Sequence, residues 1–98
     1  MATEDIETKL FEFFDYRKRL YIDRLAEAVA IPSVSSQLPS SLDSIQQMID
    51  WTANHITRLG GKVTMQPNPV ATAERALPPI LLAEFGQDPQ KKTLCAYG

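Results

Sequence analysis

Apolar residues recur every three or four positions over the first thirty residues of the chain. The recurring residues are Ile6, Leu10, Phe13, Phe14, Leu20, Tyr21, Leu25, Ala28 and Val29. This spacing places them on one face of a helix, and Pro32 restricts the residue before it to an extended backbone. The pattern therefore predicts one long helix over residues 5–30, spanning ~39 Å. A compact chain of this length has a radius of gyration of only ~13 Å, so the helix suits a larger body.

A second helical pattern is followed by segments typical of strands. The apolar stripe of this helix consists of Leu42, Ile45, Ile49, Ala53, Ile56 and Leu59. Gly60 and Gly61 supply a helix stop, which predicts a helix over residues 41–59. Alternating polar and apolar residues predict a strand over 62–66, and short apolar runs predict strands over 79–85 and 92–97.

The order of these elements, two helices and then three strands, predicts an α/β fold. Residues 93–97 are uncharged and apolar on both faces, which is typical of an interior strand covered from both sides. No later segment is present to cover that strand. The first helix is also longer than a compact chain of this length can cover. We therefore expect residues 1–98 to form the amino-terminal part of one larger domain with an incomplete mixed sheet, and to contain no complete domain.

Composition narrows the function classes further. Hydrophobic residues make up 44% of the chain and charged residues 22%, which is ordinary for a soluble globular protein. A net charge of −2 with evenly mixed signs disfavours nucleic acid as a partner. No apolar run approaches the ~20 residues of a membrane span, so we expect no membrane partner. One cysteine and an acidic amino-terminal segment indicate a reducing, cytoplasmic location.

The side chains that could carry chemistry all have simpler structural interpretations. They are His55, Cys95, Trp51 with Met48, the serines Ser33, Ser35 and Ser36, and the pair Lys91 and Lys92. His55 lacks a ligand partner at helical spacing and is interpreted as solvent-facing. Cys95 is interpreted as an inert thiol within a buried strand. The aromatic and methionine pair is expected to pack at a helix edge, the serines to form a loop, and the lysines to form a solvated turn.

Four stretches together resemble the cytosolic nonspecific dipeptidase and carnosinase family of two-metal peptidases. They are YIDRLAEAVAIPSVS at residues 21–35, LGGKV at 59–63, LPPILL at 77–82 and GQDPQKKTLCAYG at 86–98. The resemblance covers about residues 18–98, and the last stretch is the most specific. It implies the amino-terminal part of a metallopeptidase catalytic domain, without the separate lid domain through which family members form homodimers.

The resemblance also implies where the chemistry lies. In this family the strand ending in Tyr-Gly is followed by His-X-Asp, whose His binds the first metal, so Gly98 would lie beside that ligand. Two divalent ions, zinc or manganese, share a water that a glutamate deprotonates for attack on the peptide carbonyl of a dipeptide. The other ligands and the glutamate come later in the chain. We therefore expect no catalytic, metal-binding or substrate-binding residue within residues 1–98, and no metal held by this chain alone.

Two functions follow. The leading one is the amino-terminal fragment of a metal-dependent dipeptidase, a hydrolase whose fragment is inactive by itself. The alternative is a genuine short, non-catalytic protein that acts as a binding or regulatory partner through its long first helix. Arg17 and Arg24 interrupt the apolar pattern of that helix, which argues against a coiled coil.

The expectation that the chain is a fragment of a dipeptidase can be tested in the reading frame. If the chain is a fragment of this family, the frame should continue past Gly98 with His, one variable residue and then Asp. Sequencing of the transcript provides the check. A continuation without His-X-Asp in its first few codons would contradict the family assignment, and a stop codon directly after Gly98 would favour the short protein.

Overall fold

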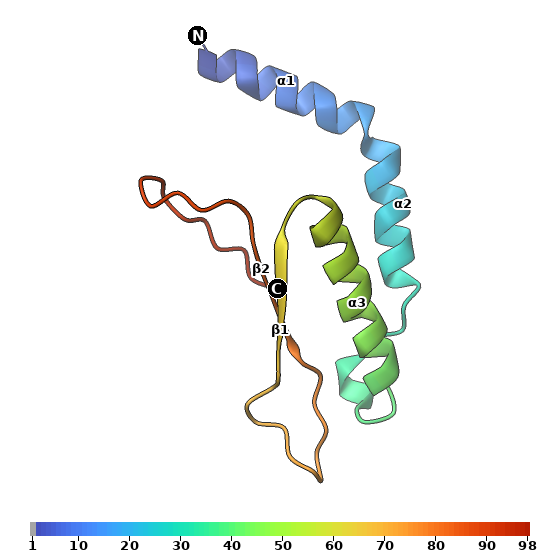
Figure 1. Cartoon of the computed structure of the whole chain (residues 1–98). Coiled ribbons are helices and arrows are strands. Elements are labelled where there is room, and N and C mark those ends of the chain that lie inside the picture. Colours follow the sequence, from blue (N-terminus) through green and yellow to red (C-terminus); the bar gives the residue numbers. More distant parts are fainter. Residues whose placement is uncertain (1) are drawn as a thin grey trace. The chain divides into compact units, whose positions relative to one another are not determined.

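The computed structural model describes residues 2–98, with side chains described from Asp5 onward. The elements in order are α1 (Ala2–Tyr16), α2 (Lys18–Val29), a short 3-10 helix (Ser35–Gln37), α3 (Leu42–Arg58), β1 (Lys62–Gln66) and β2 (Ile80–Glu84) (Figure 1). The chain divides into two compact units, one up to Met48 and one over Ile49–Gly98.

In the first unit, the helix predicted over residues 5–30 is divided in two at Arg17. The backbone of Arg17 has φ −100° and ψ 11°, outside the ordinary helical range. Its N–H still donates to the Phe13 carbonyl at 3.1 Å, and its own carbonyl accepts from the Tyr21 N–H at 3.2 Å. The prediction of one continuous helix is therefore wrong at this residue, while the helical hydrogen-bond pattern runs across the bend.

Aromatic contacts accompany the bend. The Arg17 guanidinium carbon lies 5.1 Å from the centre of the Phe13 ring, a cation–π arrangement. The rings of Phe14 and Tyr21, on opposite sides of the bend, meet edge to face with centroids 6.1 Å apart. Rings seven residues apart on a straight helix would be separated by about two turns, roughly 11 Å along the axis. The contact therefore favours a bent over a straight helix.

Two serine hydroxyl groups stabilise the connection between α2 and α3. Ser41 is 5% exposed, and its hydroxyl donates to the Val34 carbonyl at 2.7 Å. The neighbouring Ser40 hydroxyl donates to the Gln37 carbonyl at 2.6 Å. These two bonds hold the loop against the start of α3, whose limits confirm the helix predicted over residues 41–59.

In the second unit, β1 and β2 form a two-stranded antiparallel sheet. Lys62 pairs with Glu84 at one end of the ladder and Gln66 with Ile80 at the other. The strands predicted over 62–66 and 79–85 are thereby confirmed. Because side chains alternate between the faces of a strand, Val63 and Leu81 share one face, and both are half-buried.

The third strand, predicted over residues 92–97, is absent, and this prediction is wrong. Residues 93–98 have no regular structure, Leu94 is 95% exposed and Tyr97 is fully exposed. A strand with two apolar faces gains stability from neighbouring strands and from layers on both faces. No strand among residues 2–98 pairs with this segment. The α/β class holds, with a sheet of two strands rather than three.

The turn between α3 and β1 depends on its two glycines for different reasons. Gly60 has φ +93°, a conformation that side chains with a Cβ rarely adopt. At Gly61, a Cβ would lie 2.6 Å from Ile56 Cγ2 and 2.8 Å from Phe85 Cζ. Gly61 therefore lets the end of α3 and the residue after β2 approach the same point of the backbone.

A buried apolar core is absent from the described part of the chain. Among residues 5–98, no hydrophobic side chain is buried, and Ser41 is the one buried polar residue. Several of the exposed apolar side chains on α1 and α2 share one helical face and are here called the apolar stripe; its members are Ile6, Leu10, Phe13, Phe14, Tyr21 and Leu25. Hydrophobic burial is the main favourable term in folding, so each unit relies on local hydrogen bonds and helix propensity.

Thermal unfolding of residues 1–98 should therefore lack a cooperative transition. A domain of about 100 residues normally unfolds with an enthalpy of roughly 60–80 kcal/mol. Without a buried core, we expect a van't Hoff enthalpy below about half of that value, measured by circular dichroism at 222 nm. We also expect size-exclusion chromatography to show aggregated or oligomeric species. A monomer with a sharp transition would show instead that the chain is a self-sufficient domain.

Candidate functional site

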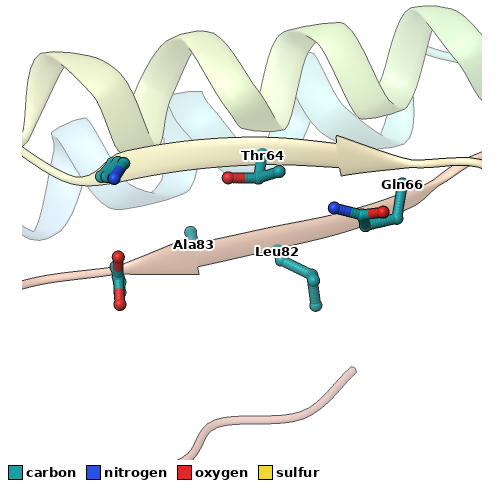
Figure 2. A pocket seen from close by; sticks show the side chains of 6 residues that line it. Thr64, Gln66, Leu82 and Ala83 are labelled. Carbon is teal, nitrogen blue, oxygen red and sulfur yellow. The ribbon is translucent and has the colours of Figure 1, made fainter.

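A shallow hollow on the second unit lies over the β1–β2 sheet. It has a volume of about 250 Å³ and is lined by Lys62, Thr64, Gln66, Leu82, Ala83 and Glu84 (Figure 2). The ladder sets Lys62 opposite Glu84 and Thr64 opposite Leu82, and all six side chains are exposed. The hollow offers one amine, one carboxylate, one amide and one hydroxyl. It contains no histidine or cysteine that could act as a nucleophile or metal ligand.

His55 lies on α3 against Trp51, one turn earlier. The two ring centroids are 4.2 Å apart with the planes tilted by 50°. Both residues are half-buried, so the expectation of a solvent-facing histidine is wrong. The predicted packing of Trp51 and Met48 at a helix edge is confirmed by their half-buried side chains. A histidine ring tilted against an indole ring is a packing arrangement.

Cys95 is exposed, so its prediction as a core thiol is wrong. The cause is the missing third strand, because the segment that carries Cys95 has no sheet to enter.

The serine and lysine clusters form local backbone structure, as predicted. The Ser33 N–H donates to the Ile31 carbonyl at 2.8 Å, and Ser35 opens the 3-10 helix. The Lys91 N–H donates to the Asp88 carbonyl at 3.0 Å and closes a turn whose side chains are exposed. Sequence reasoning missed Ser41, the serine with a buried hydroxyl. Its type and spacing resemble those of Ser40, so no signal in the sequence separates the two.

Metal ligands are not gathered in the described part of the chain. Among residues 5–98, no three His, Cys, Asp or Glu side chains lie close enough to share one ion. A metal pair needs several such ligands converging on one place, so these residues do not fit one. The described helices also include none long and apolar enough to cross a membrane.

Comparison with known proteins connects this arrangement to a family. No family model matches the chain. The Cys-Gly metallodipeptidase DUG1 of Candida albicans is 39% identical over 95 residues, which cover 91% of this chain and 19% of that protein. The human Beta-Ala-His dipeptidase is 35% identical over 95 residues, with coverage of 92% and 19%. The chain is similar to these dipeptidases over part of their length.

The structural comparison agrees with this relationship. A solved structure of the dipeptidase Dug1p from Saccharomyces cerevisiae matches 87% of this chain with a TM-score of 0.74 and 30% identity. The predicted resemblance to the dipeptidase and carnosinase family is thus confirmed. The chain spans about a fifth of the length of the dipeptidases that it matches, 19% in both sequence comparisons and in the Dug1p structure.

That no residue of this chain is a metal ligand stays a prediction, and calorimetry can test it. Titration of residues 1–98 with zinc or manganese should show no stoichiometric binding tighter than about 10 μM, which is roughly −7 kcal/mol. His55→Ala is the matched variant and should behave identically. Tight binding that disappears in His55→Ala would overturn the prediction and place a ligand on α3.

Proposed function

We propose that this chain is the opening part of a metal-dependent dipeptidase and that the whole enzyme hydrolyses dipeptides. The observation that carries the proposal is the match to the metallodipeptidases in both sequence and fold. Identity of 34–39% extends over 91–93% of the chain in the three fungal enzymes. A TM-score of 0.74 over 87% of the chain supports the same assignment at the level of fold.

Within that enzyme, the role proposed for these residues is structural. The described residues hold no cluster of metal ligands, and the sheet hollow presents neither a histidine nor a cysteine. No step of hydrolysis is assigned to any of them. The chain would supply two helical elements and a sheet hairpin, and residues outside it would hold the metals and the substrate.

The metals are proposed to be two divalent ions, zinc or manganese, as the family resemblance implies. The name of the three fungal relatives, Cys-Gly metallodipeptidase, supports a metal requirement without naming the ion. The whole enzyme is further proposed to be a cytoplasmic homodimer. A single cysteine supports a reducing compartment, and the lid domain of the family would supply the dimer contact.

A chimera tests the proposed function. In it, this chain replaces the segment of the Saccharomyces cerevisiae Dug1p that it matches. We expect metal-dependent hydrolysis of Cys-Gly within about tenfold of Dug1p, since a tenfold loss is only about 1.4 kcal/mol of barrier. Steady-state kinetics on the purified chimera, with and without added metal, provide the measurement.

Variants within the chimera test the structural role. His55→Ala and Cys95→Ser remove the two side chains with the most reactive chemistry, and each should leave kcat within about twofold, well under 1 kcal/mol. The Dug1p portion without any replacement segment is the negative control. A folded, soluble chimera with no more hydrolysis than that control would contradict the proposed function.

A further inference from the structure

We draw no further inference here: the strongest candidate, the apolar stripe on the exposed face of α1 and α2, carries no proposal because nothing in the structure shows what covers it.

Discussion

The exposure of apolar side chains along α1 and α2 is the constraint on which the rest of the structure depends. Complete burial of a Leu, Ile or Phe side chain contributes about 1.5–3 kcal/mol. The six residues of the apolar stripe, if covered, could therefore contribute on the order of 10 kcal/mol, as much as the whole stability of a typical domain. In the described part of the chain this contribution is not realised, because no hydrophobic side chain is buried.

Local interactions explain the elements that form in spite of this. The β1–β2 hairpin brings together strands separated by 13 residues, from Gln66 to Ile80, and its ladder satisfies backbone groups without a core. Ser41 ties the loop before α3 through one buried hydroxyl, and Gly61 permits the close approach of Ile56 and Phe85. The segment over residues 92–97 has no such local partner, and it remains exposed.

The sequence predicted what depends on local pattern and failed where the outcome depends on neighbours. The limits of α3, β1 and β2 follow from apolar periodicity and glycine positions that are visible in the sequence. The bend at Arg17 could not be predicted, since it accompanies a contact between Phe14 and Tyr21 and breaks no propensity rule. Cys95 was assigned to a core because its segment is apolar on both faces, yet a buried strand also needs layers to cover it. His55 was placed in solvent because periodicity does not report its stacking on Trp51.

Amide hydrogen exchange measures most directly whether the apolar stripe becomes covered when the chain is part of a whole dipeptidase. Exchange would be followed at the backbone amides of α1 and α2, first in residues 1–98 alone and then in the chimera with Dug1p. In the isolated chain we expect protection worth no more than about 1–2 kcal/mol, as for fraying helices. In the chimera, the free energy of opening for the same amides should rise by several kcal/mol and approach the free energy of global unfolding. Strong protection in the isolated chain, or equally weak protection in an active chimera, would contradict the account.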